Sequence, residues 1–350
     1  MKVKKEKLTS VELENQEPSY ADFFKKVELL PLETTDQSLV ANVSKILEVD
    51  GKLVVFDNSR RYVKVFSDDG RYLNDIGKLG QGPEEYTDVY DVTYNSAARC
   101  LTLLSPFGEV VNYSPEGKFV DRFFLPSKPN YWSAEWIDAD RIALWSGVDE
   151  DEPGVTVYDR KTDETVMEGW YNCFEFDFTS QTPFFRCDDT LRFSEPFGNR
   201  VFELTADSLS FAYEWDFGKS NISEQYRQEL AGMADRQARR DMMKKDFGGD
   251  RYRYNLVRNM ANKRYLVSLI LTRPYPDLQF RTVIYDLGKD SGICLDRFKE
   301  GMSFRPVFMN EEYVVCEVPY DEIETYNRLF GYSISQDEDS NVILAKYHFL

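Results

Sequence analysis

The sequence predicts an all-β fold, a six-bladed β-propeller of four-stranded antiparallel blades, and three observations carry this prediction. Aromatic residues make up 15% of the 350 residues, which favours sheets over helices. Short apolar runs alternate with Asp-Gly pairs and Asn/Ser clusters, which are typical of hairpin turns. The central turns of the units lie near residues 58, 106, 151, 197, 275 and 320, and most steps are about 45–48 residues, the length of a propeller blade.

The first unit shows the pattern most clearly. Strands are expected at residues 43–49, 53–56, 62–66 and 72–76, with turns at Asp50-Gly51, at 57–61 and at 68–70. Gly77, Gly80 and Gly82 follow in a link to the next unit. They do not open a helix after a parallel strand, so a phosphate-binding loop is not indicated. We expect them to form a tight passage between two blades.

Five further units follow, and one of them is preceded by an insertion. The units span residues 89–125, 131–171, 174–217, 252–298 and about 305 to the end. The single long step between central turns is explained by residues 220–249. Asn221 and Glu224 fit a capping box, and apolar residues follow at helical spacing: Ile222, Tyr226, Leu230 and Met233. We therefore predict a helical insertion between blades 4 and 5.

The sixth unit is incomplete by itself. It offers strands near 305–309, 313–318 and 342–349, and a short helical insertion at 321–330. An isolated strand at 23–33 has no hairpin partner nearby. Because an open sheet edge is a liability, we predict that this N-terminal strand completes the last blade. The expected domain organisation is a polar N-terminal tail at residues 1–22 and a single propeller domain at 23–350.

Three short motifs resemble a known family. Residues 56–73 with the link at 77–86 are similar to the NHL-type repeat. Together with the stretches at 31–35 (PLETT) and 341–347 (NVILAKY), the chain resembles six-bladed β-propeller proteins common in Bacteroidota, many of them predicted lipoproteins of unknown function. The resemblance implies the periplasm or the cell surface and supplies no catalytic residues. No signal peptide or lipobox cysteine is recognisable, so a cytoplasmic location stays the alternative.

Charge and residue supply restrict the chemistry. The formal net charge of −18 argues against nucleic-acid binding, and no apolar run is long enough to span a membrane. The five cysteines form no C-x-x-C pair, and His348 is the single histidine. A multi-histidine metal site is therefore excluded, and nucleophilic catalysis with a histidine base would have to use His348. We expect no cofactor, although a structural cation in the channel stays open, and we expect a monomer.

Topology indicates where a ligand would bind. In a four-stranded meander the second-to-third turn and the link between blades lie at the same end, and both helical insertions fall in such positions. Insertions collect on the face that carries function. Candidate ligand-binding residues at this end are Arg60, Arg61, Tyr86, Phe107, Tyr131, Trp132, Phe197 and Tyr275.

The leading hypothesis is a non-catalytic binding propeller for a glycan, a peptide or a protein partner. Two alternatives stay open. One is a lyase or hydrolase acting on a carbohydrate or lactone with carboxylates at the channel mouth. The other is a scaffold of a cell-envelope assembly. A cluster of three or more carboxylates would favour the enzyme.

Overall fold

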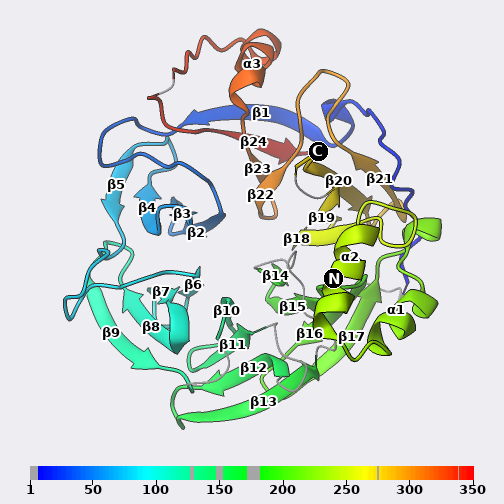
Figure 1. Cartoon of the computed structure of the whole chain (residues 1–350). Coiled ribbons are helices and arrows are strands. Elements are labelled where there is room, and N and C mark those ends of the chain that lie inside the picture. Colours follow the sequence, from blue (N-terminus) through cyan, green and yellow to red (C-terminus); the bar gives the residue numbers. More distant parts are fainter. Residues whose placement is uncertain (1–6, 127–129, 147–152, 172–181, 274–275, 338) are drawn as a thin grey trace. The chain divides into compact units, whose positions relative to one another are not determined.

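The computed structural model describes residues 7–126, 130–146, 153–171, 182–273, 276–337 and 339–350. These residues form six antiparallel sheets of four strands each, which confirms the six-bladed β-propeller (Figure 1). The chain divides into two compact units, one of residues 17–139 and 297–350 and the other of residues 1–16 and 140–296. Each unit is described by itself.

The unit of residues 17–139 and 297–350 contains the first, second and last sheets. The first sheet has β2 (Lys45–Val49), β3 (Lys52–Asp57), β4 (Tyr62–Phe66) and β5 (Tyr72–Asp75). The second has β6 (Asp91–Asn95), β7 (Cys100–Leu104), β8 (Glu109–Tyr113) and β9 (Phe119–Phe124). Asp50 and Gly51 both have positive φ, 52° and 73°, as the predicted Asp-Gly hairpin turn requires. β10 (Ser133–Trp136) also belongs to this unit.

The last sheet confirms the predicted closure by the N-terminal strand. Its order is β1 (Phe24–Pro31), β24 (Ile343–Phe349), β23 (Tyr313–Glu317) and β22 (Pro306–Met309), and α3 (Ile323–Phe330) lies between β23 and β24. β1 pairs with β24 in antiparallel register, with Val27 opposite Tyr347. The Tyr347 ring is fully buried against the rings of Phe24 and Phe304, at centroid distances of 5.2 and 5.4 Å. Aromatic packing therefore holds the closing strand in place.

The unit of residues 1–16 and 140–296 contains the other strands and the main insertion. The third sheet continues with β11 (Arg141–Trp145), β12 (Pro153–Asp159) and β13 (Glu164–Tyr171). The fourth has β14 (Phe184–Cys187), β15 (Thr190–Ser194), β16 (Arg200–Leu204) and β17 (Leu209–Glu214), and the fifth has β18 (Asn255–Ala261), β19 (Tyr265–Arg273), β20 (Gln279–Asp286) and β21 (Ser291–Leu295). Between β17 and β18 lie α1 (Glu224–Ala231) and α2 (Arg236–Asp246), so the insertion predicted there is present as two helices.

The N-terminal segment differs from the polar tail that the sequence predicts. From Lys7 onward it packs on this second unit, because Leu8, Val11 and Leu13 are buried. The backbone N–H of Leu8 donates to the carbonyl of Glu214 at 3.0 Å, and that of Val11 donates to Asp216 at 2.8 Å. Three apolar residues among polar ones are enough to anchor the segment once a strand edge is available.

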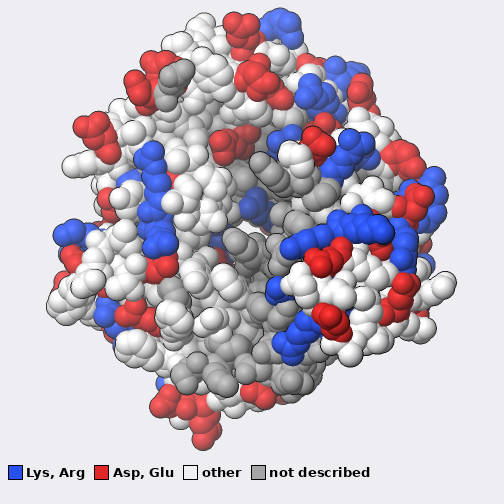
Figure 2. All heavy atoms as spheres, viewed as in Figure 1, with Lys and Arg blue, Asp and Glu red and all other residues white. Residues whose placement is uncertain are grey.

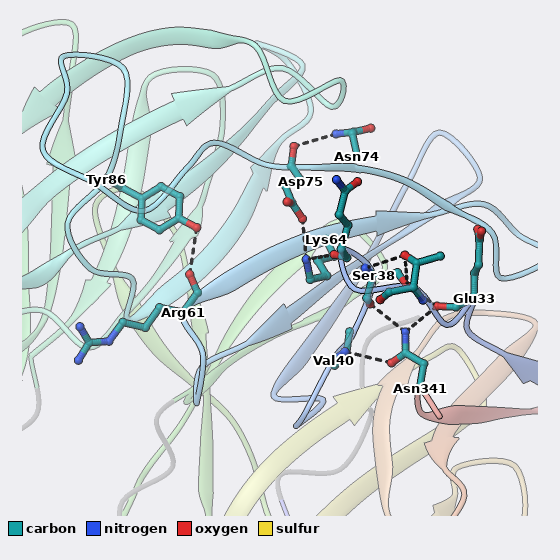
Figure 3. A network of polar contacts seen from close by, with 11 residues as sticks. Glu33, Ser38, Val40, Arg61, Lys64, Asn74, Asp75, Tyr86 and Asn341 are labelled. Carbon is teal, nitrogen blue, oxygen red and sulfur yellow. Dashed lines mark hydrogen bonds and ion pairs between the residues drawn. The ribbon is translucent and has the colours of Figure 1, made fainter. Parts of the chain in front are cut away.

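The motifs that carry the family resemblance have structural roles. In the glycine-rich link, the N–H of Gly82 donates to the Glu85 carboxylate at 2.9 Å, and a Cβ on Gly80 would lie 2.0 Å from the same carboxylate. The Tyr86 hydroxyl donates to the carbonyl of Arg61 at 2.9 Å (Figure 3). The glycines thus allow the tight turn that we expected between two blades.

The other two motifs meet although they lie about 300 residues apart. The Asn341 amide donates to the carbonyls of Glu33 and Ser38, at 2.9 and 2.8 Å, and its oxygen accepts from the N–H of Val40 at 3.0 Å (Figure 3). Nearby, the buried Lys64 ammonium lies 2.8 Å from the Asp75 carboxylate. This network fixes the segment between β1 and β2 against the start of β24.

Candidate functional site

A polar pocket of ≈ 350 Å³ lies within the unit of residues 1–16 and 140–296. Its walls come from four separate stretches of chain. These are the N-terminal segment, the stretch between β17 and α1, the residues after α2, and the ends of β19 and β20 that face their connection. The residues that line it are Leu13, Glu14, Ser220, Gly248, Gly249, Asp250, Arg253, Thr272, Arg273, Gln279 and Arg281. Its volume falls within the range of small-ligand sites, about 300–1,000 Å³.

Two of the pocket walls follow from local geometry. Arg273 is opposite Gln279, and Ile270 is opposite Arg281, where β19 and β20 approach their connection. The pairing therefore brings Arg273, Gln279 and Arg281 to the same end of the hairpin. After α2, Gly248 has a φ of 83° and its N–H donates to the carbonyl of Tyr252 at 2.8 Å, which turns the chain back towards β18.

The helical insertion is held rigidly beside the pocket. Leu230 is fully buried, and Phe197 packs edge-to-face on Tyr252 with ring centroids 5.0 Å apart. Arg227 donates to the carbonyl of Phe197 at 2.8 Å, and the Arg251 guanidinium lies 4.4 Å from the ring centroid of Tyr226. Gly248, Gly249 and Asp250 follow α2 directly, so one wall of the pocket is a loop that adjoins these packed helices.

The pocket lining carries three arginines and two acidic residues. Arg253 pairs with the exposed Asp250, and Glu14 pairs with Lys219 at 3.2 Å, just outside the lining. The backbone N–H of Glu14 and the Lys219 ammonium both lower the pKa of the Glu14 carboxyl. Among the described residues, Arg273 and Arg281 have no carboxylate within ion-pair distance. Arg281 donates instead to the carbonyl of Leu13.

Two of the pocket-lining arginines, Arg253 and Arg281, each have a buried Nε atom without a hydrogen-bond partner in the described part of the chain, as do Arg122 and Arg192 outside the pocket. A buried unpaired donor costs folding free energy, so such groups call for an explanation. Figure 2 also shows Lys and Arg side chains gathered over α2, which carries Arg236, Arg239, Arg240, Lys244 and Lys245.

Three of the sequence-predicted ligand residues are buried. Tyr86, Tyr131 and Phe197 are each at most 2% exposed, and their rings pack in the interior. Tyr275 lies outside the described residues. The pocket lining contains none of the predicted residues that the structure describes.

The remaining predicted residues lie at the surface of the other unit. Phe107 is 77% exposed at the β7–β8 connection, with a strained φ of 62°. Arg60 is exposed, and Arg61 pairs with Asp88 at 3.0 Å. Trp132 stacks on Tyr90 with ring centroids 4.9 Å apart and an interplanar angle of 4°. Ligand contact by these residues stays a prediction.

Sequence reasoning missed Arg253, Arg273 and Arg281. The available signal was weak: Arg253 directly follows the insertion, and the other two arginines flank the central turn of the fifth blade. Nothing in their spacing indicates that they share a pocket.

No group of three or more His, Cys, Asp or Glu side chains in the described part of the chain is placed to hold a metal ion. None of its helices has the length and apolar character to cross a membrane.

Residues 8–348 match the profile of a family described as "Domain of unknown function (DUF4934)". The chain belongs to the DUF4934 family. No curated protein matches the sequence. Among solved structures, this DUF4934 protein is similar to a "Putative exported protein" of Bacteroides fragilis, with a TM-score of 0.78 and 16% identity over 98% of this chain and 99% of the other.

A second similar structure is a member of the DUF4221 family from Bacteroides vulgatus. The TM-score is 0.59 and the identity is 10%, over 93% of this chain and 96% of the other. At these identities the likeness shows a shared fold. The predicted resemblance to six-bladed propellers of Bacteroidota is confirmed by the family match and by the Bacteroides fragilis structure.

Proposed function

We propose that this DUF4934 propeller is a non-catalytic binding protein that holds a glycan, peptide or protein partner at the end of the fold carrying α1 and α2. The observation that supports the proposal most is the pocket between this insertion and the β19–β20 connection. It combines a defined cavity, convergent polar side chains and rigid supporting elements, as binding sites do. The function requires no cofactor.

The proposed location is the periplasm or the cell surface. The similar structure from Bacteroides fragilis bears the description of an exported protein, and the family resemblance points the same way. Fractionation of cells that make the natural full-length protein would test this location. Recovery with the cytoplasmic fraction would contradict it.

A glycan and peptide screen on the purified protein tests the binding function. We expect a ligand whose binding is lost in Thr272→Trp, because the larger side chain would fill the pocket. Leu278→Trp is the matched control, since Leu278 lies on the same connection, is 53% exposed and does not line the pocket. The circular dichroism spectra and melting temperatures of both variants establish that they are folded.

Two further variants test the sequence-predicted residues. Trp132→Ala and Arg60→Ala change the other unit and leave the pocket intact. If they abolish binding while Thr272→Trp does not, the ligand binds at the predicted residues and the pocket is not the site. If no glycan or peptide binds at all, the proposed function is wrong for these ligand classes.

A further inference from the structure

We infer that the pocket recognises an acidic saccharide, a sugar that carries a carboxylate or sulfate group, through the guanidinium groups of Arg273 and Arg281. This inference rests on the proposed binding function and names the chemistry of its ligand.

The charge of the pocket is opposite to that of the chain. The chain has a formal net charge of −18, yet three arginines and two acids line the pocket. Of the two acids, Asp250 forms an ion pair with Arg253, and Glu14 forms one with Lys219. This leaves Arg273 and Arg281 without a neutralising carboxylate among the described residues. A concave site with such a surplus favours an anionic group.

The other lining groups suit hydroxyls better than apolar side chains. Ser220, Thr272 and Gln279 supply polar atoms, and Gly248 and Gly249 expose backbone. Apart from the two glycines, Leu13 is the single apolar residue in the described lining, and this lining contains no aromatic residue. A peptide with apolar anchors would find little surface to bury here. A sugar ring offers many hydroxyl groups to such a surface.

The arginine donors fit an oxyanion geometrically. A guanidinium presents two parallel N–H groups that pair with both oxygens of a carboxylate, or with two oxygens of a sulfate. Arg281 is partly buried and oriented by its bond to the Leu13 carbonyl, whereas Arg273 is exposed at the rim. Arg281 is therefore positioned before the ligand arrives, and Arg273 can close on the anion from outside.

Titration calorimetry with four defined probes tests the inference. The probes are digalacturonic acid, its neutral counterpart galactobiose, a sulfate monoester of galactobiose, and the blocked acidic dipeptide acetyl-Glu-Glu-amide. We expect binding of an acidic disaccharide at least about tenfold tighter than that of galactobiose, because charged hydrogen bonds are the stronger ones. The carboxylate and sulfate arms identify which oxyanion is preferred.

Substitutions then assign the effect to the arginines. Arg273→Gln and Arg281→Gln should each weaken binding of the acidic disaccharide about tenfold or more, and Arg281→Lys should restore part of the loss. The Arg273 side chain makes no hydrogen bond to the described residues, so its variant tests the site even if Arg281→Gln loosens the N-terminal segment. Arg71→Gln removes an equal charge from an exposed arginine paired locally with Asp69 in the other unit and should change nothing.

The outcomes separate this inference from the function on which it rests. If a neutral glycan or a peptide from the screen binds and Thr272→Trp removes that binding, while neither acidic disaccharide binds, the function stands and the inference is overturned. Binding of the acidic dipeptide as tight as that of the acidic disaccharides also overturns it. Acidic disaccharide binding that survives both Arg→Gln substitutions does the same.

Discussion

At the scale of single residues, the side chain of Asn341 makes four hydrogen bonds to the backbone. It is 2% exposed, donates to two backbone carbonyls and accepts from the N–H groups of Val40 and Val342. No other side-chain type of this size offers two donors and an acceptor in one plane. The Asn at the start of the closing motif therefore has a structural role.

Asn341→Ala should destabilise the protein by about 3 kcal/mol, because four backbone groups lose a hydrogen bond at once. Chemical denaturation followed by circular dichroism measures the effect. Asn42→Ala is the matched control, since Asn42 is exposed and bonds only to other exposed side chains; it should cost under about 0.5 kcal/mol. Equal losses in the two variants would contradict this role.

A pH-dependent effect is expected at Glu317. Burial raises the pKa of its carboxyl above the ordinary value, so the folded state binds this proton more tightly than the unfolded state does. Stability is therefore lost as the pH rises from the unfolded pKa through the raised folded pKa. Glu317→Gln should melt about 1–3 °C higher than the parent at pH 8 and show no such gain at pH 3.

Glu116→Gln is the control for the pH series. Glu116 is exposed, and the hydroxyl of Ser114 lowers the pKa of its carboxyl. Its replacement should give no gain in melting temperature at pH 8. A gain for Glu317→Gln that persists at pH 3 would show that ionisation is not the cause.

The residues that form the pocket could not be predicted from the sequence. Phe107 and Arg60 are exposed, but the burial of Tyr86 and Phe197 depends on tertiary neighbours that local sequence does not reveal. The arginines of the pocket come together only because β19, β20 and the chain after α2 converge. Periodicity predicts elements, and it says little about contacts between distant segments.

At the scale of elements, the strands and the main insertion were predictable because each has a local signal. Asp-Gly turns set the first hairpin, and the apolar spacing of Ile222, Tyr226 and Leu230 marked α1. The docking of residues 7–16 was not predictable, since its few apolar residues lack a clear period. Its partners are the backbone groups of Glu214, Asp216 and Cys294, far along the chain.

Leu230→Ala should destabilise the insertion strongly. Leu230 is fully buried among the side chains of Phe197, Tyr226 and Phe247, so its removal leaves a cavity and costs about 3 kcal/mol. Hydrogen exchange of the α1 and α2 amides would report this loss locally. Leu329→Ala in α3 is the control, because Leu329 is 37% exposed and its truncation should cost under about 1 kcal/mol. Unchanged protection of α1 in Leu230→Ala would contradict the packing role.

At the scale of the whole molecule, the repeat length and the incomplete sixth unit were enough to predict six sheets and the closure by the N-terminal strand. Both predictions depend on the number and spacing of the predicted strands, and these can be read from the sequence without knowledge of side-chain contacts. The closing sheet has the order β1-β24-β23-β22. β24, the last strand in the chain, is therefore paired on both sides, with β1 and with β23.

Deletion of residues 342–350 should abolish cooperative folding. It removes β24, the strand with which both β1 and β23 pair, and it exposes the aromatic side chains around Phe24. We expect loss of a sharp thermal transition and appearance in the insoluble fraction. Removal of Leu350 alone, a residue that is 57% exposed, should leave the transition intact. A soluble, cooperatively melting deletion variant would show that the closing strand is dispensable.

The pairing of β1 with β24 also sets an order of events during synthesis. Pro31 meets Ile343, and 343 − 31 = 312 residues separate these partners. At about 5–20 residues per second, the first strand leaves the ribosome roughly 15–60 s before its partner exists. Lys25 and Lys26 point to solvent on this strand and Glu28 is half-buried. Until β24 has been synthesised, these charged side chains oppose aggregation of the unpaired β1 strand.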